Sequence, residues 1–225
     1  MSHAQNIERI KIVYNALGEI ADEVVFVGGA TVSLYADRPA GEIRPTDDVD
    51  IMVEVAGYGG YSALEEKLRR KGFTNDQNSR VICRYQVNGV IVDVMPTDQN
   101  ILGFSNRWYK PAFASAVVIA PEEGYSFRIL RPAYFIATKL EAFIGRGRGD
   151  GRTSTDFEDI VYIFNNRTTI WNEMREADLH LLEYFKDRFA QLLQVPYVEE
   201  WIAASLDFSE RNRTDYIVHN LRSLL

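Results

Sequence analysis

Apolar positions in the first part of the chain switch between helical and strand spacing. Residues 6–20 carry apolar side chains at every third or fourth position, which predicts an amphipathic helix. The β-branched and aromatic run at 24–27 predicts a strand, and Gly28-Gly29 predicts a tight turn into a short helix. Period-two alternation over residues 48–55 predicts a second, half-buried strand.

Residues 38–72 contain the signals of a loop and of a helix. Two prolines and a glycine within residues 38–46 indicate a loop. Ser62 and Glu65 have the spacing of a capping box, so we expect a helix over 61–71 that stops at Gly72.

The pattern of apolar and polar residues over 81–95 predicts a β-hairpin. Residues 81–87 and 90–95 alternate on either side of Asn88-Gly89, the residue pair most typical of a two-residue hairpin turn. Aromatic-rich loops follow, with two further short strands expected at 116–119 and 126–130.

From Pro132 onward the pattern is helical. A helix is expected over 132–144, and the glycine- and arginine-rich run at 145–155 predicts an exposed, mobile connection. Thr155 and Glu158 form another capping box at the start of a helix. Further helical patterns lie near 171–194, 197–205 and 208–224.

The order of elements predicts an α+β protein. Residues 1–130 form an α/β-type half with a mixed sheet and flanking helices, and residues 131–225 form a helical half. We treat these two segments as separate domains.

Composition narrows the class of protein. The 225 residues are 46% hydrophobic and 25% charged, and no apolar run approaches the ~20 residues of a membrane helix. The single cysteine, Cys83, excludes a disulfide framework. The first 15 residues have no long apolar stretch behind a basic region, so we read no signal peptide and expect a cytoplasmic protein. Without a membrane-length apolar run, we expect no membrane partner. The net charge of -7 argues against broad, sequence-blind binding to nucleic acid.

Three aspartates break the strand pattern. Asp48 and Asp50 are two apart on one strand, so their side chains share a face with Cα atoms roughly 7 Å apart. Asp93 interrupts the apolar second strand of the hairpin, against β propensity. Paired carboxylates on one face suit a shared divalent metal ion, and the alternative is three solvent-facing strand residues.

These residues, in their order along the chain, resemble the nucleotidyltransferase superfamily that includes DNA polymerase β. The likeness rests on a strand ending in Gly28-Gly29, the run from Arg44 to Asp50, and a later strand carrying Asp93. Within the superfamily the chain is most similar to the AbiEii-type toxin nucleotidyltransferases of toxin–antitoxin and phage-defence systems. Residues 139–143, the glycine- and arginine-rich loop and residues 156–160 are similar to the second motif block of that family.

The resemblance implies roles for particular residues. Asp48, Asp50 and Asp93 would hold two Mg²⁺ ions, with Mn²⁺ as the alternative metal, and Asp93 would help activate the acceptor hydroxyl. Lys139 would reach the nucleotide and complete the catalytic set. The other substrate-binding positions implied are Gly28, Gly29, Thr31, Thr46, Arg146, Asp156 and Asp159. Many relatives have Gly-Ser where this chain has Gly28-Gly29, which leaves Thr31 or backbone N–H groups to contact phosphate.

Several of these residues also have an ordinary structural explanation. Lys139 would be a helix residue whose stem covers apolar neighbours while its tip reaches water. Asp156 would simply favour the N-terminus of its helix. Arg146, Arg148 and Arg152 would be the charges that any solvated loop carries.

The function expected from the resemblance is metal-dependent transfer of a nucleoside monophosphate from an NTP to an acceptor. The favoured acceptor is RNA, at a tRNA end, with the protein acting as a toxin that an antitoxin protein controls. The alternatives are a small-molecule transferase of the aminoglycoside-modifying kind and a non-catalytic, NTP-binding regulatory protein on the same fold.

Overall fold

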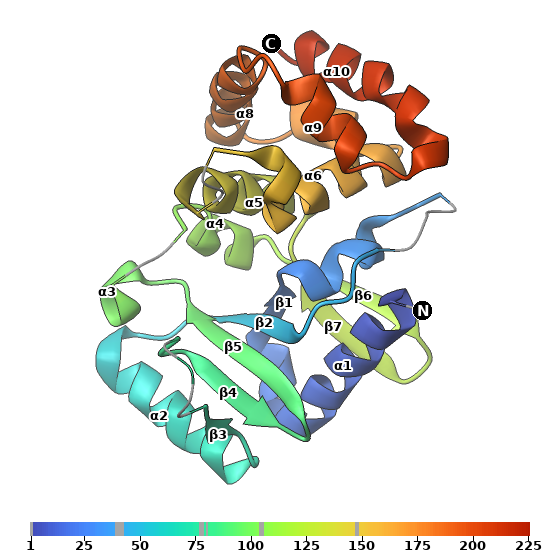
Figure 1. The fold of residues 1–225 in the computed structure, drawn as a ribbon. Coiled ribbons are helices and arrows are strands. Elements are labelled where there is room, and N and C mark those ends of the chain that lie inside the picture. The colour runs from blue at the N-terminus through green and yellow to red at the C-terminus, as the bar shows by residue number, and fades with distance from the viewer. Residues whose placement is uncertain (1, 39–42, 77–78, 80, 104–105, 147–148) are drawn as a thin grey trace. The chain divides into compact units, whose positions relative to one another are not determined.

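The computed structural model describes residues 2–38, 43–76, 79, 81–103, 106–146 and 149–225 (Figure 1). The chain divides into two compact units. Unit 1 comprises Met1–Leu34 and Glu42–Arg131, and unit 2 comprises Tyr35–Gly41 and Pro132–Leu225. The short segment after Leu34 therefore belongs with the C-terminal part of the chain. In the described part, none of the helices has the length and apolar character needed to cross a bilayer.

Unit 1 contains a mixed sheet. Its described strands number seven and follow the order β3-β4-β5-β2-β1-β7-β6. The strands are β1 Val24–Val27, β2 Asp48–Val53, β3 Thr74–Asn75, β4 Arg84–Val87, β5 Val90–Pro96, β6 Val117–Glu122 and β7 Tyr125–Ile129. β2 runs antiparallel to β1 and parallel to β5, so the expected mixed sheet is confirmed.

The hairpin formed by β4 and β5 follows from its turn residues. Asn88 and Gly89 both have positive φ, 48° and 80°, as a type I′ turn requires. Val90, Val92 and Val94 of β5 are buried on one face of the sheet. The hairpin prediction is confirmed, although β4 begins at Arg84 rather than at residue 81.

Helices of unit 1 differ in their limits from the sequence prediction. α1 spans Ser2–Leu17, and a 3₁₀ helix, Gly18–Glu23, replaces the expected continuation. Gly18 has a φ of +57°, a conformation that ends an α-helix. A second 3₁₀ helix, Gly29–Tyr35, follows the diglycine turn.

The start of α2 was predicted wrongly. α2 spans Gly57–Arg70, with Ala56 at the N-cap, so Ser62 and Glu65 lie inside the helix and do not cap it. A capping box is recognised only by the spacing of two residues, and that spacing also occurs inside helices. The true start of α2 is rich in glycine, so it has no capping side chain that a sequence pattern could identify. The stop at Gly72 is confirmed by its φ of +90°.

Short elements escaped prediction from the sequence. β3 was missed, as were two helices within the expected loops, α3 Gln99–Leu102 and α4 Tyr109–Ala114. Each spans at most six residues, too few for a periodic pattern to be recognised. The two expected strands after them correspond to β6 and β7.

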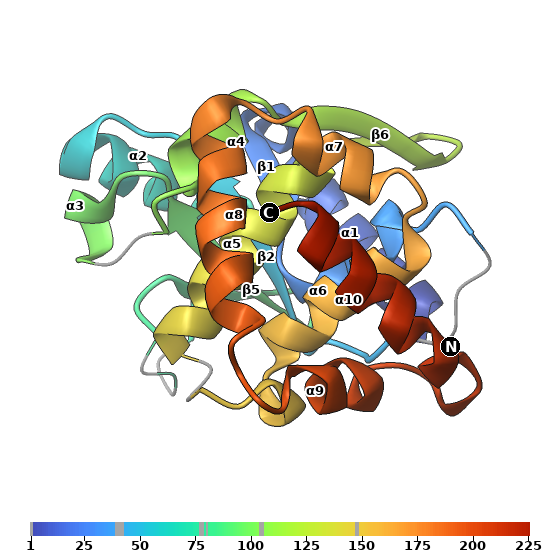
Figure 2. The same ribbon diagram turned by 90° about the horizontal axis from the view of Figure 1, so that it is seen from above.

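The regular elements in the described residues of unit 2 are all helices. Its longest elements are α5 Pro132–Arg146, α6 Thr155–Asn166 and α8 Leu179–Leu192. The others are α7 Ile170–Arg175, α9 Val198–Ala204, α10 Thr214–Ser223 and the 3₁₀ helices Gly151–Thr153 and Phe208–Arg213. α5 contacts α6, α7 and α8, and α10 packs on α8 and α9 (Figure 2).

Three predictions for unit 2 need correction. The connection after α5 is not irregular throughout: Gly151 is buried, and a Cβ there would lie 2.8 Å from the Trp201 ring. α6 is capped by the Ser154 side chain, which accepts a hydrogen bond from the backbone N–H of Phe157, and not by Thr155. The pattern expected near 171–194 also proves to be two helices, α7 and α8.

Candidate functional site

Three carboxylates of unit 1 lie on one face of the sheet. β2 and β5 are parallel neighbours in which Asp50 is directly opposite Asp93, so both side chains point to the same side. Asp48 is two residues before Asp50 on β2 and shares that face. We call these three residues the acidic face. The expected convergence of aspartates from two strands is therefore present.

Burial distinguishes the acidic face from an ordinary wet strand surface. Asp93 is only 8% exposed, and Asp48 and Asp50 are half-buried. The explanation of Asp93 as a solvent-facing residue is therefore wrong. Buried carboxylates are costly unless a positive charge or donors compensate them.

Arg84 supplies that positive charge. It lies directly across the hairpin from Asp93, and its Nε and Nη2 donate to the two Asp93 oxygens at 2.8 and 2.7 Å. Nη2 also donates to Oδ2 of Asp48 at 3.2 Å. The hydrogen bond from Arg84 to Asp93 raises the pKa of the guanidinium against the opposing effect of burial, so Arg84 is permanently charged.

Gly28 brings the backbone close to the acidic face. Its φ is +73°, and a Cβ built there would lie 1.8 Å from Oδ2 of Asp50. The close approach excludes a side chain at this position, and the positive φ is a conformation that residues with a side chain rarely adopt. The diglycine is therefore needed because the Asp50 carboxylate sits against the turn.

The second glycine and two threonines complete the turn. A Cβ on Gly29 would lie 2.7 Å from Cγ2 of Thr46 and 2.8 Å from Nη2 of Arg44. The Thr31 hydroxyl is buried and donates to the Gly28 carbonyl at 3.0 Å, so in this structure it closes the turn. A contact between Thr31 and phosphate stays a prediction.

Asn6 of α1 fixes the approach to β2. Its Oδ1 accepts hydrogen bonds from the backbone N–H and the hydroxyl of Thr46, at 3.2 and 3.4 Å. The Thr46 hydroxyl also lies 3.2 Å from the Asp48 carbonyl, to which it donates. Arg9 donates to the Thr46 carbonyl as well. Thr46 thus positions the start of β2, and its role in binding substrate stays a prediction.

The donor set of the acidic face suits a hard divalent cation. Carboxylate oxygens are the ligands that Mg²⁺ prefers, and three aspartates supply them. As the side chains stand, no group of three or more His, Cys, Asp or Glu residues within the described ranges is arranged to hold a metal ion. The three aspartates are therefore residues of the type that binds Mg²⁺. In this structure Arg84 forms ion pairs with two of them, Asp93 and Asp48.

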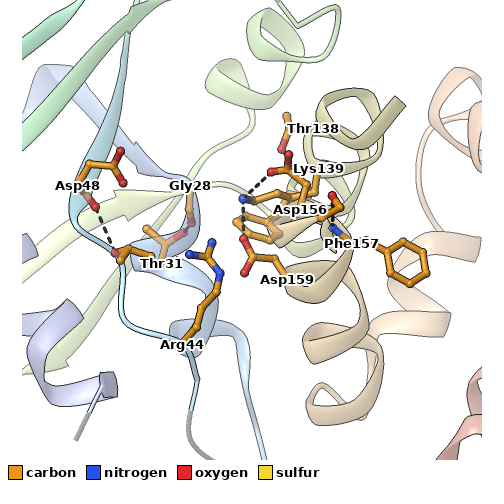
Figure 3. Close-up of polar contacts among 12 residues, drawn as sticks. Gly28, Thr31, Arg44, Asp48, Thr138, Lys139, Asp156, Phe157 and Asp159 are labelled. Atoms are coloured by element: carbon orange, nitrogen blue, oxygen red, sulfur yellow. Dashed lines mark hydrogen bonds and ion pairs between the residues drawn. The ribbon is translucent and has the colours of Figure 1, made fainter. Parts of the chain in front are cut away.

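A second charged cluster lies within unit 2. The Lys139 ammonium contacts Oδ1 of Asp156 at 3.1 Å and Oδ2 of Asp159 at 2.6 Å (Figure 3). Arg146 donates to both oxygens of Asp156, at 2.8 and 3.0 Å. We call these four residues the Lys139 cluster. It joins α5 to α6 and balances two negative charges with two positive ones.

The electrostatics of the Lys139 cluster favour the ionised state. Burial acts to raise the pKa of the Asp156 carboxyl, but hydrogen bonds from Arg146 and the positive charges of Lys139 and Arg146 leave that pKa below its ordinary value of 3.8. Only 9% of the Lys139 side chain is exposed, and its ammonium contacts two carboxylates whose side chains are 3% exposed. The explanation of Lys139 as a residue with a solvated tip is therefore wrong.

Charges in the arginine-rich loop are paired within unit 2. Arg152 contacts Asp150 at 2.9 Å and Glu200 at 3.1 Å, while Arg146 contacts Asp156. Arg148 lies outside the described residues. These pairs reduce the positive charge that the loop offers to RNA.

Sequence reasoning missed Arg84 and Asn6. A signal for Arg84 was available, because a two-residue turn at Asn88-Gly89 fixes the hairpin register and counting outward from it places Arg84 opposite Asp93. Nothing comparable marked Asn6, whose contact with Thr46 joins residues 40 positions apart.

The fold can be compared with known proteins. Models of known protein families and the curated proteins give no match. Among solved structures, the chain is similar to the crystal structure of an antigenic nucleotidyltransferase-like protein from Paracoccidioides brasiliensis, with a TM-score of 0.54 and 17% sequence identity. The match covers 92% of this chain and 96% of the other. The fold of this chain is therefore nucleotidyltransferase-like.

Proposed function

We propose that this protein is a divalent-metal-dependent nucleotidyltransferase that moves a nucleoside monophosphate from an NTP to an acceptor. The observation that supports this most is the acidic face, where Asp48, Asp50 and Asp93 meet on one side of the sheet beside Gly28. The similarity of fold to a nucleotidyltransferase-like protein agrees with the proposal.

In this proposal the three aspartates hold the metal. Asp48, Asp50 and Asp93 would hold Mg²⁺, which would supply positive charge to offset the negative charge of the triphosphate and of the pyrophosphate leaving group. Asp93 would also accept the proton of the acceptor hydroxyl, on a carboxylate lone pair that Arg84 does not use. Gly28 and Gly29 leave space for Asp50, Thr46 and Arg44 to pack against the turn, and the backbone N–H groups of the turn are the proposed contacts for the triphosphate.

The acceptor proposed is RNA, and the role proposed is that of an AbiEii-like toxin under the control of an antitoxin protein. Both come from the motifs shared with that family. The arginines of the loop after α5 add little support, because Arg146 and Arg152 are paired with acidic residues. A contact of Lys139 or Arg146 with nucleotide stays a prediction.

A labelling experiment tests the activity. The protein is incubated with each α-labelled NTP and Mg²⁺, in separate reactions with total RNA, total protein and an aminoglycoside panel. We expect transfer to RNA, which Asp48→Asn or Asp93→Asn abolishes while the circular-dichroism spectrum stays unchanged. The matched control is Asp47→Asn, a change at an exposed residue next to Asp48, which should leave transfer intact.

The outcomes separate the alternatives. If only an aminoglycoside becomes labelled, the acceptor is a small molecule and not RNA. Binding of Mg²⁺–NTP without transfer to anything would support the non-catalytic regulatory protein. Transfer that persists in Asp48→Asn would refute the assignment of the acidic face as the catalytic site.

The toxin role has its own test. Induced expression in bacteria should arrest growth, and Asp48→Asn should relieve the arrest at equal protein level. Arrest that is equally strong with Asp48→Asn would contradict a toxic role for nucleotide transfer.

A further inference from the structure

Arg84 is placed where a metal ion would need to bind. Its guanidinium makes two hydrogen bonds to Asp93 and reaches Asp48 on the next strand, so one cation bridges two members of the acidic face. The fork of Nε and Nη2 matches a carboxylate in the strong bidentate manner. The pair is also largely shielded, since 23% of the Arg84 side chain and 12% of the Asp93 side chain are exposed.

We propose that Arg84 is a built-in counter-cation that competes with divalent metal for Asp48 and Asp93 and so sets the metal affinity of the site. The inference rests on the proposed function, because it assumes that these aspartates are the metal ligands. It adds a residue that none of the sequence motifs includes.

The competition follows from charge and position. Each Asp93 oxygen already accepts one hydrogen bond from Arg84, so a metal ion that binds the remaining lone pairs would lie close to the guanidinium. A guanidinium cannot lose its proton to make room, and it repels a dication at close range. The metal therefore binds more weakly than it would to the three carboxylates alone.

A purely structural role makes a different prediction. If Arg84 only ties β4 to β5, its removal lowers the stability of the hairpin and does not improve metal binding. If Arg84 competes with the metal, its removal strengthens metal binding. The sign of the change in affinity thus distinguishes the two roles, independently of enzymatic activity.

The experiment measures Mn²⁺ binding to the full chain without nucleotide, by the electron paramagnetic resonance signal of free Mn²⁺. The proteins compared are wild type, Arg84→Gln, Arg84→Lys and the control Arg70→Gln. Arg70 has a side chain that is 77% exposed on α2, so its replacement changes the net charge equally at a distant surface. We expect Arg84→Gln to lower the Kd about tenfold, which corresponds to ~1.4 kcal/mol.

The other two variants refine the result. Arg84→Lys keeps the charge and loses the bidentate fork, so its Kd should lie between those of wild type and Arg84→Gln. Arg70→Gln should stay within about twofold of wild type, since exposed charges are screened by salt. An Arg84→Gln Kd equal to or higher than that of wild type would overturn the inference. Should Arg84→Gln fail to fold, Arg84→Lys decides by the same criterion.

A further variant separates this inference from the proposed function. Asp48→Asn should abolish Mn²⁺ binding in the wild-type background. Mn²⁺ binding that survives this change would remove the acidic face as the metal site and would refute the proposed function. Binding that depends on Asp48 but is not strengthened in the Arg84 variants would refute only the competition by Arg84.

Discussion

Replacing Lys139 by methionine should strongly destabilise unit 2. The change removes a positive charge held within 3.1 Å of Asp156 and 2.6 Å of Asp159, while each aspartate side chain is 3% exposed. Two unit charges about 4 Å apart attract by ~4 kcal/mol at an effective dielectric constant of ~20, and the cost of desolvation offsets part of this. Removing one partner of a buried pair costs about 3–5 kcal/mol. Because Arg146 still neutralises Asp156, we expect a loss near the lower limit, about 3 kcal/mol.

Urea denaturation followed by tryptophan fluorescence measures this loss. Trp171 and Trp201 are buried in unit 2 and report its unfolding. The control is Lys186→Met, at an exposed position on α8, which should change the free energy of unfolding by no more than ~0.5 kcal/mol.

A double-mutant cycle isolates the pair between Lys139 and Asp159. Removing both charges leaves fewer uncompensated groups than removing the lysine alone, so Lys139→Met combined with Asp159→Asn should be less destabilised than the sum of the single changes, by about 1 kcal/mol or more. A loss below ~1 kcal/mol for Lys139→Met, or strict additivity in the cycle, would refute the view that the cluster stabilises the packing of α5 on α6.

Further predictions concern single groups. Gly28→Ala should abolish nucleotide transfer, because the new Cβ would lie 1.8 Å from Oδ2 of Asp50 in a backbone with φ +73°, whereas the wild-type level of labelled product would contradict this close approach. Asp156→Asn should be less stable than wild type above about pH 3.8, and the difference should vanish as pH falls through the lowered pKa of Asp156, because protonation then removes the wild-type carboxylate too. Urea midpoints measured between pH 3 and 7 check this, and a difference that does not depend on pH would refute it. Burial raises the pKa of the Cys83 thiol to about 11, so a thiol reagent should label the folded protein at pH 8 far more slowly than the unfolded protein, and equal rates would show that the side chain is accessible.

The sequence predicted the elements that have strong local signals. Asn88-Gly89 identified the hairpin, and a period of two placed Asp48 and Asp50 on one face of their strand and Asp93 on the face of its own strand opposite to Val92 and Val94. The order of strands in the sheet brought β2 and β5 side by side, which no local pattern contained.

Side-chain partners across the sequence were harder to foresee. The interpretations of Asp93 and Lys139 as solvated residues failed because burial depends on contacts between distant segments. Lys139 contacts Asp156, which lies seventeen positions later in the chain. Both residues are buried among apolar side chains where α5 packs on α6. Arg84 was overlooked because an arginine in a strand has no special meaning by itself. Its importance comes from Asp93, the residue opposite it on β5.

The assignment of Tyr35–Gly41 to unit 2 has a consequence for dissecting the protein. The Tyr35 ring packs at a tilt against Phe135, Asp37 accepts hydrogen bonds from Thr168, and Arg38 donates to the Asn165 carbonyl. This stretch therefore packs with residues 100 to 131 positions downstream. A fragment ending at Arg131 would carry the stretch without its partners, and one beginning at Pro132 would lack it. Neither unit can be separated by cutting the chain at a single peptide bond. A gene fusion or a split version that uses unit 2 would therefore have to include Tyr35–Gly41 together with Pro132–Leu225.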